Sequence, residues 1–139
     1  MKQPTTPKWY AKARKYLGIE EWPGNWQDNP VIVGFFDYTS YHATHDEVPW
    51  CSAFMNAVFA QVGIDGSGSA AAISWLHWGN RLKVPKLGCV AVFEHHVALF
   101  AKHEGDGLIR LLGGNQSNQV NESLFAEARV LSYRWPEGE

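Results

Sequence analysis

Residues 49–63 read PWCSAFMNAVFAQVG, and this stretch decides the fold. Its apolar side chains recur with the three- and four-residue spacing of a helix. They are Cys51, Phe54, Met55, Val58, Phe59 and Val62. The pattern predicts a helix that begins at Cys51, packs one face on a core and ends at Gly63.

Cys51 opens this helix, directly after Pro49 and Trp50. A thiol there lies beside backbone N–H groups that have no helical partner, and at the positive end of the helix dipole. Both effects favour the thiolate, which is the nucleophilic form of cysteine. Cys51 is therefore a candidate nucleophile, and it needs a base.

Further helix signals lie around this stretch. Thr6-Pro7 and Asn29-Pro30 each have the form of an N-cap followed by a first helical residue, so we expect a helix after both. Ser69 predicts the cap of another short helix. Residues 37–48 are polar and contain histidines, which indicates a loop.

The pattern changes to strands after Pro85. Residues 87–93 are almost wholly apolar, as in a central strand that is covered on both faces. Further strands are predicted over residues 97–101, 108–112 and 130–133. Because helices come first and strands follow, we expect an α+β fold with N-terminal helices packed on an antiparallel sheet. The length of 139 residues predicts one domain, residues 1–139.

Composition excludes several classes of protein. A net charge of −2 and a pI near 6.3 give no bulk attraction to nucleic acid. Two cysteines are too few for a disulfide framework. No apolar run approaches the ~20 residues of a membrane span, and no basic-then-apolar leader is present. We expect a monomer, synthesised in the cytoplasm without a signal peptide, with no integral membrane segment and no cofactor.

The base is sought among six histidines. His95 and His96 lie beside the apolar strand, and adjacent strand residues point to opposite faces, so only one of them can face the Cys51 helix. Spacing alone leaves that choice open. Asn115 follows the next strand and is a candidate for fixing the tautomer of the imidazole. Taken alone, the order Cys, His, Asn is a weak signal, because a cysteine on an apolar helix is often a buried small hydrophobe.

A zinc site is an alternative. His42 and His45, with Asp46 or His103, carry ligand chemistry. Two histidines three apart in a loop lack the helical His-Glu-x-x-His arrangement, so we predict no metal. Cys89 lies inside the apolar strand and is expected to be structural.

Several ordered stretches carry a family resemblance. They are PWCSAF (49–54), GSAAAISWLHWG (68–79), HVALF (96–100), LGGNQSN (112–118) and YRWP (133–136), with LGIEEWPG (17–24) and Asn29-Pro30 before them. Together they resemble phage-associated cell-wall hydrolases that belong with the CHAP and NlpC/P60 cysteine peptidases and amidases. The match covers nearly the whole chain in order.

This resemblance implies a papain-like fold with the nucleophile at a helix N-terminus packed on a sheet. It maps the nucleophile to Cys51 and the base to His96, because the family histidine is followed by Val and a small residue. It maps a polar residue to Asn115, and Glu94 is a rival for orienting His96. Gly113 stands where many CHAP enzymes have an acidic residue.

Substrate contacts are expected from Trp50, Trp75, Trp78 and Gln116. The implied function is hydrolysis of an amide bond in the peptide stem of bacterial peptidoglycan, as an N-acetylmuramoyl-L-alanine amidase or an endopeptidase. A phage or prophage endolysin, acting on the wall or periplasm after release, is the expected role. The alternatives are a secreted antibacterial amidase effector and a non-catalytic wall-binding module.

Overall fold

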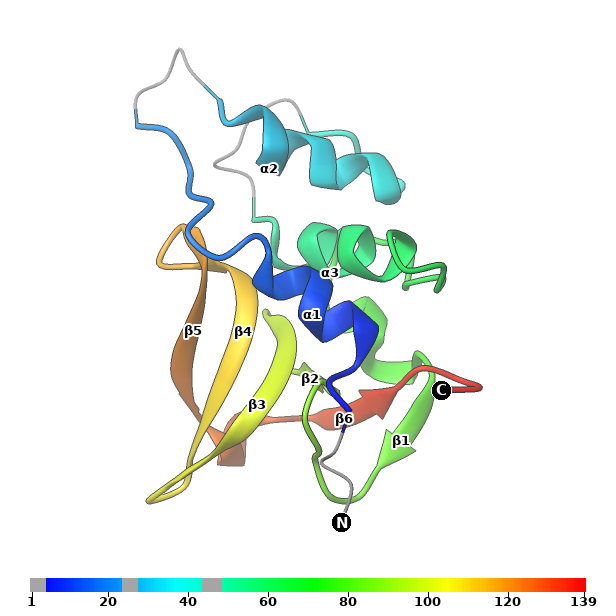
Figure 1. Cartoon of the computed structure of the whole chain (residues 1–139), viewed down its shortest axis with the longest axis vertical. Coiled ribbons are helices and arrows are strands. Elements are labelled where there is room, and N and C mark those ends of the chain that lie inside the picture. The colour runs from blue at the N-terminus through cyan, green and yellow to red at the C-terminus, as the bar shows by residue number, and fades with distance from the viewer. Residues whose placement is uncertain (1–4, 24–27, 44–48) are drawn as a thin grey trace.

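The structure, a computed structural model, describes residues 5–23, 28–43 and 49–139. Figure 1 shows helices gathered over one side of a curved sheet. The helical elements are α1 (Lys8–Arg14), α2 (Pro30–Phe35), α3 (Cys51–Ala60) and the 3₁₀ turns η1 (Phe36–Tyr38), η2 (Ala72–His77) and η3 (Glu127–Arg129). The strands are β1 (Asn80–Leu82), β2 (Val90–Val92), β3 (Val97–Gly105), β4 (Leu108–Gln116), β5 (Gln119–Ala126) and β6 (Ser132–Trp135).

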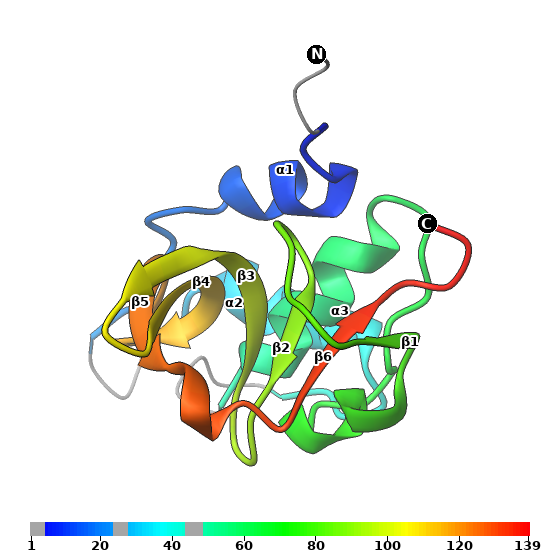
Figure 2. The ribbon, with the colours of Figure 1, turned by 90° about the horizontal axis from the view of Figure 1, so that it is seen from below.

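The strands form one six-stranded sheet in the order β1-β6-β2-β3-β4-β5. All neighbouring strands are antiparallel, so the expected α+β class with an antiparallel sheet is confirmed. The C-terminal strand β6 lies between β1 and β2, as Figure 2 shows. After the long β3-β4-β5 meander, the chain thus returns to a position inside the sheet, next to the edge strand β1.

The two edge strands, β1 and β5, were not predicted from the sequence. An edge strand pairs on one side only and is often half-exposed, so it lacks the continuous apolar run that marks a central strand. In β5, with the sequence QVNESLFA, only Val120 is fully buried. β3 and β4 also extend beyond the predicted ranges, into polar residues.

Helix starts follow the sequence signals in part. Asn29 caps α2 as predicted, with its Oδ1 accepting the Val31 N–H at 2.9 Å. At α1 the cap position is Pro7, which gives no side-chain bond, so Thr6 is not the cap. At η2 the cap position is Ala71, so Ser69 is not the cap that was predicted; its Oγ accepts the Ala71 N–H at 3.1 Å in the turn before η2.

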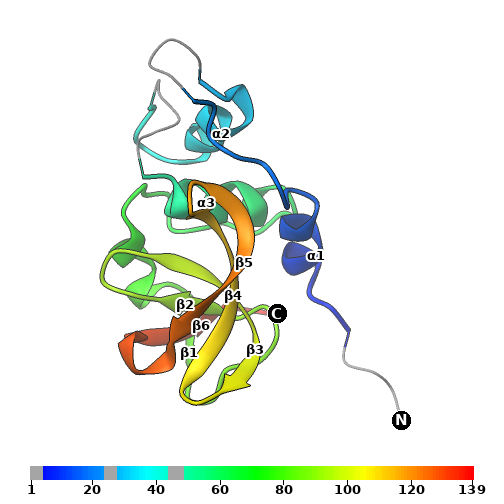
Figure 3. The same cartoon turned by 90° about the vertical axis from the view of Figure 1, so that its left-hand side faces the viewer.

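α3 is the central helix of the molecule. Every residue from Cys51 to Phe59 is buried, whereas the apolar spacing predicted a helix with one buried face. The reason is that α2 and η1 cover α3 on one side while β3 and β4 lie on the other, as Figures 1 and 3 show. Small and polar residues fill its remaining surface; for example, Asn56 Oδ1 accepts the Gly68 N–H at 2.8 Å.

The sheet buries apolar side chains on both faces. One face packs Val97, Leu99 and Leu112 against the helices. The other face carries a second cluster that includes Ala98 and Phe100, and strands with their connecting segments supply all its members. The sheet therefore curls over its own second face, which is the bend of β3 to β5 seen in Figure 3. Within the described ranges, no helix has the length and apolar character needed to span a membrane.

Gly114 sets how closely α3 approaches the sheet. A Cβ at this position of β4 would lie 2.7 Å from the Trp50 ring and 2.8 Å from Phe54 Cβ. Both neighbours are fully buried and have no room to retreat. The first turn of α3 can therefore rest on β4 only because residue 114 has no side chain.

We expect Gly114→Ala to lower the free energy of unfolding by about 1–3 kcal/mol, the usual effect of overpacking a core. Gly34→Ala is the matched control, since a Cβ at Gly34 in α2 meets nothing within 4 Å. That change should raise stability by about 0.5–1 kcal/mol through helix propensity. Denaturant unfolding followed by circular dichroism measures both. Equal stability of Gly114→Ala and the parent would contradict the close packing.

Candidate active site

Cys51 is the first residue of α3 and is 6% exposed. Burial raises the pKa of its thiol above the ordinary value of 9.0, because an ionised sulfur loses hydration. Backbone N–H groups of Val97, Ser52 and Cys51 lower that pKa, but burial outweighs them. The helix terminus therefore lowers the thiol pKa, as expected, but burial raises it by more. Cys51 is thus a neutral thiol at rest rather than a thiolate.

The contact with Val97 joins the thiol to the sheet. Val97 begins β3, and the β3–β4 ladder extends only as far as the Leu99–Leu112 pair. Val97 therefore lies beyond that ladder, and its N–H is near the Cys51 sulfur, where it lowers the thiol pKa. The residue before Val97 is His96. The start of β3 thus brings the predicted nucleophile and the predicted base into one region.

The two adjacent histidines lie in different environments. The Phe93 N–H donates to the His96 carbonyl at 2.8 Å, which closes a tight turn between β2 and β3. His95, on that turn, has 89% of its side chain exposed and lies 3.6 Å from Glu94. His96 is half-buried and stacks on Phe125, with ring centroids 5.2 Å apart and planes inclined by 16°. Of the two histidines, His96 is therefore the one whose ring is fixed in position by its neighbours.

Gln116 is the hydrogen-bond partner of His96. Its Oε1 lies 3.0 Å from His96 Nε2. Gln116 Nε2 donates to the Leu111 carbonyl at 3.2 Å and to the Asn121 carbonyl at 2.8 Å, which fixes the orientation of the amide. An amide oxygen only accepts, so the proton resides on His96 Nε2 and the neutral ring keeps a lone pair on Nδ1. Burial lowers the pKa of His96, and the bond to Gln116 opposes that effect.

A β-bulge explains why residue 116, rather than 115, reaches His96. Gly113 pairs with Asn121 and Gln116 pairs with Gln119, so β4 has one more residue between these pairs than β5. Asn115, in this bulge, has a φ of 56°, a left-handed conformation that asparagine tolerates. The extra residue shifts the alternation of side chains, so that Gln116 takes the face that Asn115 would have had.

Gly113 makes room for the Gln116 side chain. A Cβ on Gly113 would lie 2.6 Å from Gln116 Oε1 and 2.7 Å from Ala98 Cβ. The oxygen that accepts from His96 thus occupies the volume of a missing side chain. The glycine at residue 113 and the use of Gln116 as the partner of His96 are two parts of one arrangement. A Gly-Gly-Asn run near the end of a strand is the signal that could have indicated the bulge.

The structure also describes the surroundings of the other predicted site residues. Glu94 is 79% exposed on its side chain and contacts His95, so it is not the partner of His96. Trp50 and Trp75 are fully buried and their indole N–H groups donate to Glu21 and Ser52, which places them in the core rather than in a groove. Trp78 is half-buried and donates to the Asp65 carbonyl at 3.0 Å. Gln116 is 4% exposed and engaged with His96 rather than open to a substrate.

A pocket beside His96 was not foreseen from the sequence. It has a volume of about 630 Å³ and lies between the β2–β3 turn and the β5–β6 connection. His96, Phe93 and Phe125 form part of its wall, with Leu124 and Arg129. The pocket is mainly apolar, with charged groups from the turn and from η3. It offers a ligand direct access to the imidazole.

The remaining cysteine and the histidines of the zinc alternative are apart from this site. Cys89 is fully buried in the second cluster, and burial raises its pKa to about 12. His103 lies 3.0 Å from Glu127, and His42 is exposed. His45 and Asp46 fall outside the described residues. Among the residues that the structure does describe, no three His, Cys, Asp or Glu side chains form a group able to hold a metal.

Comparison of the chain with models of known protein families, and with curated proteins, finds no match. The geometry of Cys51, His96 and Gln116 must therefore carry the assignment of chemistry.

Proposed function

We propose that the protein is a cysteine amidohydrolase with a papain-like catalytic arrangement, in which Cys51 is the nucleophile, His96 the base and Gln116 the positioning residue. The observation that carries this proposal is the His96–Gln116 bond of 3.0 Å, with the amide fixed by Leu111 and Asn121. It leaves Nδ1 as the proton-accepting nitrogen of a residue that adjoins Val97, whose N–H is near the thiol. Asn115 serves the backbone bulge in this proposal.

The chemistry follows from the two resting states. Burial disfavours both the thiolate and the imidazolium, so a neutral pair awaits the substrate. His96 Nδ1 takes the Cys51 proton as the sulfur attacks an amide carbonyl, and returns it to the leaving amine. Water, deprotonated by the same nitrogen, then attacks the thioester carbonyl; the C–S bond breaks, the acid product leaves and the Cys51 thiol regains its proton. The Cys51 backbone N–H, in the first turn of α3, is the proposed donor to the oxyanion.

The proposed substrate is the peptide stem of bacterial peptidoglycan, which rests on the family resemblance of the sequence. The pocket beside His96 suits such a substrate, because it combines an apolar wall at Leu124 and Phe125 with the cation of Arg129. A stem peptide carries methyl side chains and free carboxylates, which match these groups. An endolysin is the proposed role. Mass spectrometry of digested peptidoglycan distinguishes the bond cleaved: free muramic ends identify an amidase, and split cross-links identify an endopeptidase.

Cys51→Ala should abolish release of peptides and amines from purified sacculi, with a loss of roughly 10³-fold or more, because no nucleophile remains. Cys89→Ala is the matched control, since Cys89 belongs to the cluster on the other face of the sheet. That variant should keep its activity while it remains folded. Clearance of sacculi by Cys51→Ala at the rate of the parent protein would contradict the proposal.

Substitution of His96 and of His95 should have different effects on activity in the same assay. His96→Ala is expected to lower kcat/KM by about 10²–10⁴-fold, the range for a lost general base. His95→Ala should change kcat/KM little, because the side chain of His95 is 89% exposed and its ion-pair partner is the exposed Glu94. A large loss in His95→Ala with little loss in His96→Ala would identify His95 as the base.

The pH profile tests the neutral pair and Gln116. Because burial holds the pKa of His96 below 6.5, the acid limb of kcat/KM should lie below pH 6.5 and the alkaline limb above pH 9.0, where the thiol ionises. Gln116→Glu should move the acid limb to higher pH, since a carboxylate beside Nε2 favours the imidazolium. Gln116→Met, which has no strong acceptor, should lower kcat while KM stays unchanged.

Asn115→Gly is the control for Gln116, because glycine accepts the left-handed φ of 56° without a side chain. This variant should retain the parent pH profile and most of its kcat. If it lost activity as Gln116→Met does, the orienting role would return to Asn115.

A further inference from the structure

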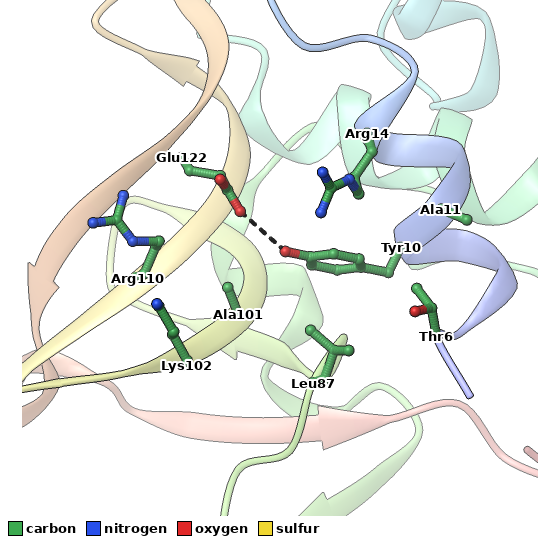
Figure 4. A pocket seen from close by; sticks show the side chains of 9 residues that line it. All are labelled: Thr6, Tyr10, Ala11, Arg14, Leu87, Ala101, Lys102, Arg110 and Glu122. Carbon is green, nitrogen blue, oxygen red and sulfur yellow. Dashed lines mark hydrogen bonds between the residues drawn. The ribbon is translucent and has the colours of Figure 1, made fainter. Parts of the chain in front are cut away.

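A second pocket lies between α1 and the β3–β4–β5 part of the sheet. It has a volume of about 710 Å³, and none of its lining residues belongs to the thiol site. Arg14 and Tyr10 come from α1, while Lys102, Arg110 and Glu122 come from β3, β4 and β5. Figure 4 shows Arg14 on the α1 side, Lys102 and Arg110 on the sheet side, and Tyr10 with Glu122 between them.

The charges of this pocket are unequal. Arg14, Lys102 and Arg110 are cations, and Glu122 is the only acidic residue that lines it. Outside the lining, Glu104 accepts from Arg110 Nε at 3.0 Å and lies 3.4 Å from Lys102 Nζ. Arg14 forms no ion pair with any residue that the structure describes, so its guanidinium retains its donors. The pocket therefore has an excess of positive charge.

The one carboxylate of the lining is already engaged. Glu122 Oε1 accepts the Tyr10 hydroxyl at 3.2 Å, as the dashed line in Figure 4 marks. Tyr10 is 3% exposed, and burial followed by the charge of Glu122 raises its pKa to about 12. The phenol is thus a permanent donor to Glu122 at neutral pH. This bond ties α1 to β5 and holds the wall of the pocket in place.

We propose that this pocket binds a phosphate group, either free or carried on an anionic polymer. The donors reach it from two directions, with Arg14 from the helix and Lys102 and Arg110 from the strands. A tetrahedral phosphate presents several acceptor oxygens and up to two negative charges, so it can engage donors on both sides at once. A planar carboxylate has two oxygens and one charge, which a single guanidinium satisfies.

This site is independent of the thiol chemistry. Its function is to hold an anionic ligand against α1 and the outer strands, at residues that play no part in the proposed proton transfers. If the ligand is a polymer, the pocket anchors the protein along it. The phosphate site is therefore tested by binding measurements alone. Their result neither supports nor refutes the proposed hydrolase activity.

The test is titration of the full chain with inorganic phosphate at constant ionic strength, followed by calorimetry and by the NMR signals of Tyr10 and the Arg14 Nε–H. We expect saturable binding that weakens about tenfold or more in the double variant Arg14→Gln/Lys102→Gln, because two charge-assisted contacts are lost. Arg81→Gln/Lys83→Gln removes the same charge from exposed positions at β1 and should bind as the parent does. Glu122→Gln should tighten binding, because it removes the one negative charge of the lining.

A polyphosphate chain distinguishes the two sources. Tighter binding per phosphate than for the free ion indicates a polymer, and equal binding indicates a free ligand; both support the site. Absence of saturable binding would overturn it, as would equal losses in the two double variants. Acetate binding as strong as phosphate binding at the same ionic strength would overturn the assignment to phosphate.

Discussion

The contact between the first turn of α3 and Gly114 of β4 is the constraint on which the rest of the structure depends. Trp50 and Phe54 occupy the volume that a side chain at residue 114 would need. Their contact lowers the N-terminus of α3 onto the sheet, where the Cys51 thiol lies near the Val97 N–H. A longer side chain in β4 would lift the helix, and the thiol would lose its place at the start of β3.

The second constraint is the bulge in β4, which lies next to that contact. Asn115 takes the left-handed conformation, and the extra residue turns Gln116 toward the second face of the sheet. Gly113 leaves the space that the Gln116 amide oxygen fills. Three consecutive small or permissive residues, from 113 to 115, therefore perform three tasks: space for an amide, space for a helix, and a change of side-chain phase.

Sequence reasoning reached the parts of the fold that depend on apolar periodicity. It predicted α3 and the central strands, but missed the edge strands β1 and β5, which pair on one side and carry polar residues. It selected Cys51 and His96 through motif resemblance, whereas alternation alone left His95 open. It placed Asn115 after the end of the strand, whereas β4 continues to Gln116 through a bulge at Asn115, and Gln116 is the residue that contacts His96. The burial of Trp50 and Trp75 could not be predicted, because an indole that fills a core and one that lines a groove look alike in sequence.

The raised pKa of Cys51 changes how the helix terminus should be understood. A dipole and free N–H groups favour a thiolate only while the sulfur keeps its hydration, and at 6% exposure burial is the stronger effect. A thiol that rests neutral is a poor target for oxidants, and it becomes nucleophilic only when an imidazole removes its proton. In the proposed mechanism, the reactivity of the thiol depends on the His96 tautomer. The Gln116 amide sets that tautomer, and the bulge and Gly113 place the amide. Under that proposal the backbone of β4, rather than the helix dipole, controls when the sulfur can react.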